Sequence, residues 1–191
     1  INSRYSLPWI TGVWCMFWLS LSCVIITRMF KITNNAIIII YSISFVSFPS
    51  LTATFAYLFT ADIYMMGIFF SILSVYLAQK QNFVFLLIGS IILALSMGIY
   101  QAYLVVAMVL CVSMLMFYIL LEKTDKRSLI KLFLRYIFMG SVGVVLYFVI
   151  LEFFLNYYQI NLSSYRGINE TGSFSSILLS LKSIPSTWKY F

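Results

Sequence analysis

The longest uncharged segment of the chain is residues 81–121, QNFVFLLIGSIILALSMGIYQAYLVVAMVLCVSMLMFYILL. It is too long for one membrane helix, because about 20 apolar residues span the hydrocarbon core of a bilayer. The sequence Gly98-Ile99-Tyr100-Gln101 interrupts the apolar run near its middle, and we expect the chain to turn there. The segment therefore predicts two membrane helices joined by a tight turn.

The rest of the chain has the same apolar character. Of its 191 residues, 63% are hydrophobic and 9% are charged, whereas a soluble domain carries about 25% charged residues. The composition excludes a soluble globular fold and predicts an all-α, polytopic membrane protein surrounded by membrane lipids. The absence of histidine excludes His-based catalytic triads and most zinc enzymes. The 12 basic residues are scattered among apolar blocks, which indicates topology signals and no nucleic-acid partner.

Dividing the sequence at its charged residues predicts six transmembrane helices in a single transmembrane domain, residues 1–191. The predicted spans are about 7–27, 35–50, 62–78, 83–99, 102–121 and 136–155. The second span is expected to break at Phe48-Pro49-Ser50, because proline cannot continue the hydrogen bonding of the preceding turn. Lys131 and Arg135 share one helix face, so we expect residues 128–136 to form a short helix on the membrane surface.

The distribution of lysine and arginine predicts the orientation. Cytoplasmic loops are enriched in these residues, and eight of the twelve fall in alternate loops: Arg28, Lys31, Lys80, Lys123, Lys126, Arg127, Lys131 and Arg135. The other four are Arg4, Arg166, Lys182 and Lys189. We therefore expect the N-terminus of this chain, the segment 51–62, the turn at Gly98 and the loop 156–173 to lie on the outer side.

Several motifs of soluble enzymes are missing from the sequence. It contains no phosphate-binding G-x-x-x-x-G-K-[ST] loop, and its three cysteines lie inside apolar blocks, so no cofactor, disulfide framework or metal site is predicted. An enzyme of this kind would more naturally use a donor carried in the membrane, such as a lipid-linked sugar. Ile1 is not an initiator methionine and no signal peptide precedes the first span, so we expect a piece of a longer protein.

Asp62 is the candidate catalytic residue. It is the only acidic residue before Glu122, and it ends the outer segment 57–62, YLFTAD, directly before the third predicted span. One interpretation is an N-cap, in which the carboxylate accepts hydrogen bonds from the first N–H groups of the helix. The other is a carboxylate at the mouth of a cavity that binds sugar hydroxyls or accepts a proton. The sequence leaves both open.

Other candidate substrate-binding residues are predicted on the same outer side. The turn places Tyr100, Gln101 and Tyr103 there, either as a plain hairpin with interfacial aromatics or as a sugar site, since rings pack on sugar C–H faces and amides bind hydroxyls. The further candidates are Tyr57, Tyr64, Glu152 and Arg166. Glu152 can alternatively reach the membrane interface, and the segment around Arg166 can alternatively be a solvated loop.

The combination of Pro49, the segment YLFTAD ending at Asp62, and GIYQA at residues 98–102 resembles the Gtr-type (type II) O-antigen glucosyltransferases of bacteria and their phages. That resemblance implies a multi-pass, GT-C-like enzyme of the bacterial inner membrane. It would move glucose from a polyprenyl-phosphate-linked donor to a cell-surface polysaccharide on the outer face. The main catalytic acid of such enzymes commonly lies in the first outer loop, which would precede Ile1, and Asp62 would then be a supporting residue.

A second function class remains open at this stage. A transporter or polysaccharide flippase would bind its substrate without reacting with it. Such proteins are expected to show inverted repeats and broken helices near the membrane centre, or several charges inside the spans. The sequence shows no alignable repeat, and Glu152 is the only charged residue inside the predicted spans outside their ends. These features favour the transferase.

Overall fold

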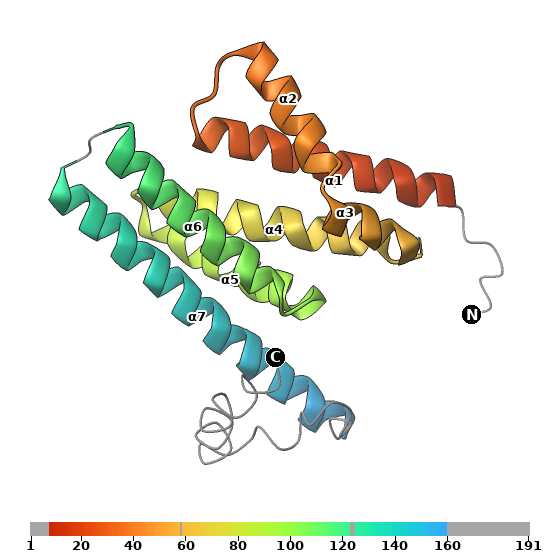
Figure 1. The fold of residues 1–191 in the computed structure, drawn as a ribbon. Coiled ribbons are helices and arrows are strands. Elements are labelled where there is room, and N and C mark those ends of the chain that lie inside the picture. The colour runs from red at the N-terminus through yellow and green to blue at the C-terminus, as the bar shows by residue number, and fades with distance from the viewer. Residues whose placement is uncertain (1–7, 58, 123–124, 160–191) are drawn as a thin grey trace, which may run out of the picture. The chain divides into compact units, whose positions relative to one another are not determined.

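The fold is known from a computed structural model that describes residues 8–57, 59–122 and 125–159. Every regular element in these ranges is a helix (Figure 1). The elements are α1 (Pro8–Met29), α2 (Asn35–Val46), α3 (Pro49–Thr54), the short 3₁₀ helix η1 (Phe55–Tyr57), α4 (Ala61–Gln79), α5 (Phe83–Ile99), α6 (Tyr103–Leu120) and α7 (Lys126–Tyr158). The predicted all-α fold class is confirmed.

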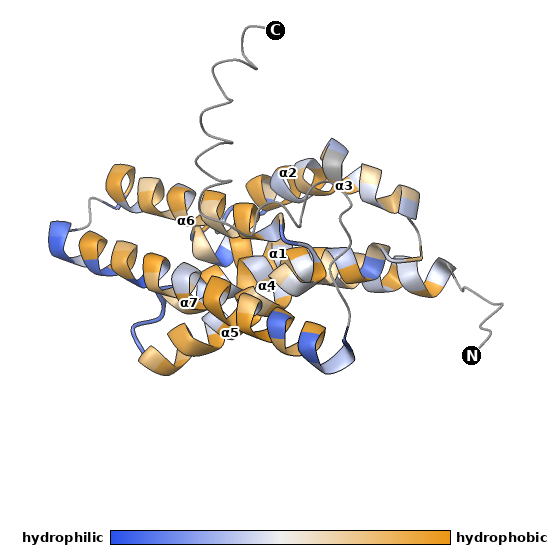
Figure 2. Cartoon of the chain, turned by 90° about the horizontal axis from the view of Figure 1, so that it is seen from below, coloured by the Kyte–Doolittle hydropathy of each residue, from blue (hydrophilic) through white to orange (hydrophobic). Residues whose placement is uncertain are grey.

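Four of these helices, α1, α4, α6 and α7, are long and apolar enough to cross a membrane. A fifth span results if α2 and the segment 51–57 are taken together, although they meet at a 48° bend. The remaining predicted span corresponds to α5, which is apolar but has only 17 residues. Figure 2 shows hydrophobic residues along most turns of these helices, as expected for a multi-pass membrane protein.

The chain divides into two compact units, residues 1–149 and 150–191. The first unit is built around α4, which packs against α1, α5 and α6. Ten of the 19 residues of α4 are buried, whereas α2 has no buried residue. Helices in a bilayer gain little from hydrophobic contact with one another, so small residues and interhelical hydrogen bonds stabilise their packing.

Small and polar residues bring α5 and α6 close to α4. Ser96 of α5 donates to the Gly67 carbonyl (2.7 Å), and Ser71 of α4 donates to the Tyr103 carbonyl (2.8 Å). Gly89 of α5 lies so close to α4 that a Cβ atom there would be 3.0 Å from the Ser74 carbonyl oxygen. These contacts hold α4, α5 and the start of α6 in a fixed arrangement.

The two predicted breaks are confirmed. Helix α2 ends at Val46, and Pro49 occupies the first turn of α3, where its missing N–H costs no helical hydrogen bond. The apolar segment 81–121 divides into α5 and α6, and the chain turns at residues 100–102. In each case a local signal in the sequence marks the end of a helix.

The predicted surface helix at residues 128–136 is wrong. These residues form the first turns of α7, a single helix of 33 residues, or about 50 Å at about 1.5 Å per residue. The Arg135 side chain binds backbone carbonyls of α4 and of the loop between α4 and α5. Its Nε donates to the Ala78 carbonyl (2.8 Å), and its Nη atoms donate to the Lys80, Gln81 and Asn82 carbonyls. Arg135 thus satisfies the C-terminal end of α4 and the loop that follows it.

The basic loops meet at one end of the first unit. Lys31, after α1, forms an ion pair with Glu122, after α6, and this hydrogen bond raises the pKa of the Lys31 ammonium. Arg135 of α7 reaches the loop between α4 and α5, as described above. These contacts bring the basic loops to one end of the first unit, while the side of the membrane stays a prediction. We call this end the basic end.

Candidate functional site

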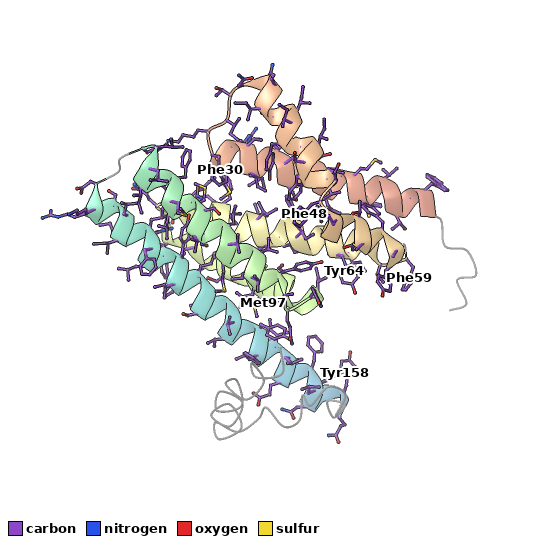
Figure 3. The ribbon with its side chains drawn as sticks, viewed as in Figure 1. Phe30, Phe48, Phe59, Tyr64, Met97 and Tyr158 are labelled. Atoms are coloured by element: carbon purple, nitrogen blue, oxygen red, sulfur yellow. The ribbon has the colours of Figure 1, made fainter. Side chains whose placement is uncertain are left out.

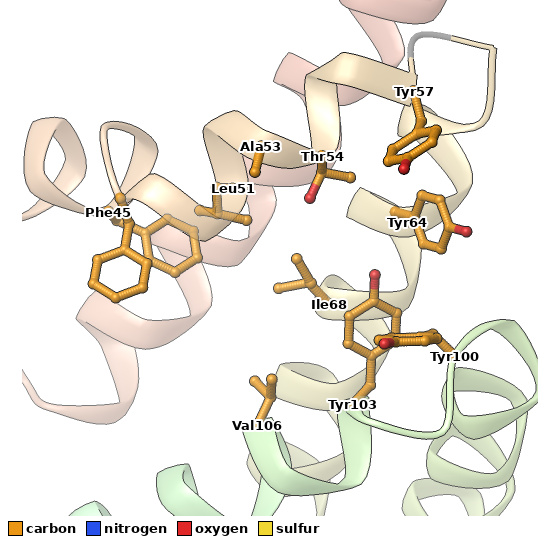
Figure 4. A pocket seen from close by; sticks show the side chains of 11 residues that line it. Phe45, Leu51, Ala53, Thr54, Tyr57, Tyr64, Ile68, Tyr100, Tyr103 and Val106 are labelled. Atoms are coloured by element: carbon orange, nitrogen blue, oxygen red, sulfur yellow. The ribbon is translucent and has the colours of Figure 1, made fainter. Parts of the chain in front are cut away.

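A cavity lined mainly by aromatic side chains lies at the other end of the first unit. Its volume is about 660 Å³. The lining residues come from α2, α3, η1, α4, α6 and the turn before α6: Phe45, Phe48, Leu51, Ala53, Thr54, Tyr57, Tyr64, Ile68, Tyr100, Tyr103 and Val106. Figure 4 shows these side chains pointing toward a common space. We call it the tyrosine cavity, after Tyr57, Tyr64, Tyr100 and Tyr103.

Glycine and serine residues determine where Tyr103 lies. A Cβ atom at Gly67 would lie 2.5 Å and 2.8 Å from two ring carbons of Tyr103, so only glycine leaves room for this ring against α4. The Ser71 hydroxyl holds the Tyr103 backbone carbonyl, and the Tyr103 side chain is only 8% exposed. Tyr103 is therefore held in place by both α4 and its own helix.

Three of the tyrosines pack edge to face. The ring centroids of Tyr64 and Tyr100 are 6.2 Å apart with an interplanar angle of 84°, and those of Tyr100 and Tyr103 are 5.5 Å apart at 76°. This geometry is favourable for aromatic pairs and limits ring motion. Tyr57 is exposed and Tyr64 is half-buried, so the cavity opens to its surroundings. Flat rings with hydroxyl tips can contact both the C–H face and the hydroxyls of a sugar.

Gln101 lies in the same turn but has a different partner. Its Nε2 donates to the Tyr147 hydroxyl of α7 at 2.6 Å, and it does not line the tyrosine cavity. The hydrogen bond fastens the turn between α5 and α6 to α7. The tyrosines on both sides of Gln101 are thereby positioned, while its own side chain is engaged.

The structure separates Asp62 from the tyrosines. Helix α4 begins at Ala61 after the N-cap residue Thr60, so Asp62 lies in the first turn and is not the N-cap itself. There its negative charge complements the helix dipole. Its half-buried side chain lines a second cavity of about 250 Å³ together with Trp14, Trp18, Ile63 and Met66. Within the described ranges, no hydrogen-bonding or ionic partner of the carboxylate is present.

Neither Trp14 nor Trp18 is among the predicted site residues. Their rings lie 6.2 Å apart and nearly parallel, at an interplanar angle of 26°, and Trp18 also contacts Phe69 of α4. The spacing of four residues in an apolar helix is the sequence signal that could have identified this pair. The second cavity, which we call the Asp62 cavity, thus combines a carboxylate with aromatic rings.

The two remaining candidates do not join these cavities in the described structure. Glu152 lies in the second unit, where it is exposed near the end of α7. Arg166 lies outside the described residues. In the part of the chain that the structure describes, no three His, Cys, Asp or Glu side chains come together, so it offers no metal-binding group.

Comparison with known proteins identifies the family. A family model described as Glucosyl transferase GtrII matches residues 1–189, nearly the whole chain. No curated protein and no solved structure shows a significant match. The family match confirms the resemblance to Gtr-type glucosyltransferases and selects the enzyme over the transporter. The chain belongs to the GtrII glucosyl transferase family and is a multi-pass membrane glucosyltransferase.

Proposed function

We propose that the enzyme transfers glucose from a polyprenyl-phosphate-linked donor to a cell-surface polysaccharide, the O-antigen, on the outer face of the bacterial inner membrane. The observation that carries this proposal is the position of the tyrosine cavity. It lies at the end of the first unit away from the basic loops, and basic loops mark the cytoplasmic side of membrane proteins. A sugar bound among these tyrosines would be at the outer surface.

The reaction exchanges one bond at the anomeric carbon of glucose. The bond from this carbon to the phosphate oxygen breaks, and polyprenyl phosphate leaves with the electron pair. A hydroxyl oxygen of the acceptor sugar forms the new bond and loses its proton to a base. No nucleotide is needed, which agrees with a chain that lacks a phosphate-binding loop of the nucleotide type.

The first turn of α4 borders both cavities. Tyr64 lines the tyrosine cavity and Asp62 lines the smaller one, so two sugars bound on either side would be close to the same helix end. We assign the glucose of the donor to the tyrosine cavity and the acceptor sugar to the Asp62 cavity. Trp14 and Trp18 would contact the acceptor ring, and Asp62 would bind its hydroxyls. Asp62 and Tyr64 point about 200° apart around α4, so Asp62 would accept the proton of a hydroxyl that extends around the N-terminal end of α4 toward the donor.

Tyr64 provides the test of this proposal. The purified protein is reconstituted in liposomes with polyprenyl-phosphate [¹⁴C]glucose and the polysaccharide acceptor, and transfer is measured. Tyr64→Ala removes the ring and is expected to lower kcat/KM about tenfold or more. Tyr64→Phe keeps the ring and is expected to lose less activity.

Tyr157→Ala is the matched control, because Tyr157 is 70% exposed in α7 and lines neither cavity. It should keep wild-type activity. Equal kcat/KM values for wild type and Tyr64→Ala would refute the assignment of glucose to the tyrosine cavity. Wild-type protein that uses a nucleotide sugar and no lipid-linked donor would refute the proposed donor.

A further inference from the structure

We infer that the prenyl chain of the donor lies in an apolar groove between α2 and α6 that adjoins the tyrosine cavity. This inference rests on the proposed function, because it assigns the lipid part of the same donor. The groove has a volume of about 410 Å³ and is bounded by α1, α2, α4 and α6. Phe45 and Val106 line both the groove and the tyrosine cavity, so the two spaces adjoin at these side chains.

The lining of the groove suits a hydrocarbon and not a polar ligand. No charged side chain contributes to it, and its residues are mainly Ile, Val, Leu and Phe. The hydroxyl of Ser113 donates to the Val109 carbonyl of its own helix (2.8 Å), so it needs no ligand. On α2, Tyr41 and Phe45 stack with an interplanar angle of 22° and form a flat wall. A branched, unsaturated chain can pack against such a surface without leaving polar groups unpaired.

The groove has the direction and the length expected for the chain of a bound donor. On α6 its lining runs from Val105 to Ser113, eight residues or about 12 Å. This distance is less than half of the hydrocarbon core, which is about 30 Å thick. At the far end the groove is lined by Phe30, which Figure 3 labels. Its ring packs edge to face on Phe117, with ring centroids 5.4 Å apart. The remainder of a long chain would therefore leave sideways into the bilayer.

Helix α2 leaves a route by which the chain can enter. None of its residues is buried, and Ile37, Ile39, Ile40 and Ile43 are at least half exposed to the surroundings. A helix so weakly covered by the rest of the unit can move without uncovering a packed core. A lipid can reach the groove from the membrane past α2, and its sugar then lies in the tyrosine cavity.

Val109→Trp tests this inference. Val109 lines the groove and is 60% exposed, so an indole ring there would fill the space without disturbing the core. Val112→Trp is the control, since Val112 is 57% exposed on the same helix and does not line the groove. Each variant is assayed with two donors, glucose on a long polyprenyl phosphate and glucose on geranyl phosphate.

We expect Val109→Trp to raise KM for the long-chain donor about tenfold, because part of the chain loses its apolar contacts. KM for the geranyl donor should change much less, which also shows that the variant is folded. Val112→Trp should match wild type with both donors. The groove is not the site of the prenyl chain if both variants change KM for the long-chain donor equally. The same conclusion follows if Val109→Trp changes KM for both donors equally.

A second measurement does not depend on glucose transfer. A photoreactive polyprenyl phosphate without glucose is irradiated with wild-type protein, and the labelled peptides are identified. We expect labelling within residues 105–113 that is reduced in Val109→Trp and retained in Val112→Trp. This result would support the groove even if wild-type protein used neither glucose donor and the proposed function had failed. Labelling confined to other helices would refute it.

Discussion

Gly67 and Tyr103 provide the sharpest prediction for a single residue. A methyl group at position 67 would overlap the Tyr103 ring, whose nearest carbon would be 2.5 Å away. We therefore expect Gly67→Ala to displace the ring, lower the free energy of unfolding by about 1–3 kcal/mol and raise KM for the donor. Thermal unfolding in detergent and transfer kinetics measure the two effects.

Gly98→Ala is the control for this substitution. A Cβ atom at Gly98 meets nothing within 4 Å, although the residue lies on the neighbouring helix α5. The control should keep wild-type KM and stability. A Gly67→Ala variant that is as stable and as active as Gly98→Ala would show that the position of Tyr103 does not depend on Gly67.

Asp62 provides a prediction about the proton transfer in the reaction. Asp62→Asn keeps the size of the side chain and removes its ability to accept a proton at neutral pH. If Asp62 is the base, kcat should fall about a hundredfold or more, with little change in KM for the donor. Asp125→Asn, at the exposed start of α7, is the matched control and should be fully active. Wild-type kcat in Asp62→Asn would exclude proton transfer by Asp62 and leave it the binding of acceptor hydroxyls and the stabilisation of α4.

The C-terminal end of α4 provides a prediction about how the contacts of a helix end affect the stability of the protein. Arg135 donates to four carbonyl groups of residues 78–82, and a lysine cannot reproduce this planar set of donors. We expect both Arg135→Lys and Arg135→Ala to destabilise the protein, the second by about 2–3 kcal/mol, because the carbonyls lose a charged partner. Arg127→Ala, at an exposed position of α7, should have no effect on thermal unfolding. Equal melting temperatures for Arg135→Ala and Arg127→Ala would disprove the capping role.

Local signals were sufficient to predict most helix boundaries. Pro49 and the turn at Gly98 each end a helix within a few residues of their own position, so the sequence alone locates these boundaries. The start of α7 could not be found in this way. Its arginine at position 135 resembles an interfacial anchor, but its partners are more than 50 residues away in the sequence. Only the packing of α7 beside the loop after α4 shows that this charge binds carbonyl groups of the protein.

Only part of the candidate site could be predicted from the sequence, because the rest depends on contacts between distant helices. The span boundaries placed Asp62 and the tyrosines at one level of the membrane, and Tyr57, Tyr64, Tyr100 and Tyr103 do line one cavity. The span boundaries do not show to which side of α4 the Asp62 and Tyr64 side chains point. Asp62 and Tyr64 are two residues apart, about 200° around a helix, so they face different neighbours. The helical period could have separated them, but only packing shows that α1 supplies Trp14 and Trp18 beside Asp62.

At the scale of the first unit, charge and aromatic side chains separate along the helices. Seven described basic residues lie in or next to the basic loops: Arg28, Lys31, Lys80, Lys126, Arg127, Lys131 and Arg135. The described residues that line the tyrosine and Asp62 cavities include no lysine or arginine. This asymmetry is what a polytopic protein needs for a defined orientation.

The same asymmetry predicts which end faces the outside of the cell. Ala102→Cys, exposed in the turn beside the tyrosines, should react with a membrane-impermeant maleimide added to intact spheroplasts. Thr33→Cys, exposed between α1 and α2, should react only after the membrane is permeabilised. The native cysteines Cys15, Cys23 and Cys111 are buried, so the wild-type protein provides a low background. Labelling of Thr33→Cys but not of Ala102→Cys in intact spheroplasts would contradict the predicted orientation. The tyrosine cavity would then open to the cytoplasm, where it could not bind a polysaccharide on the cell surface.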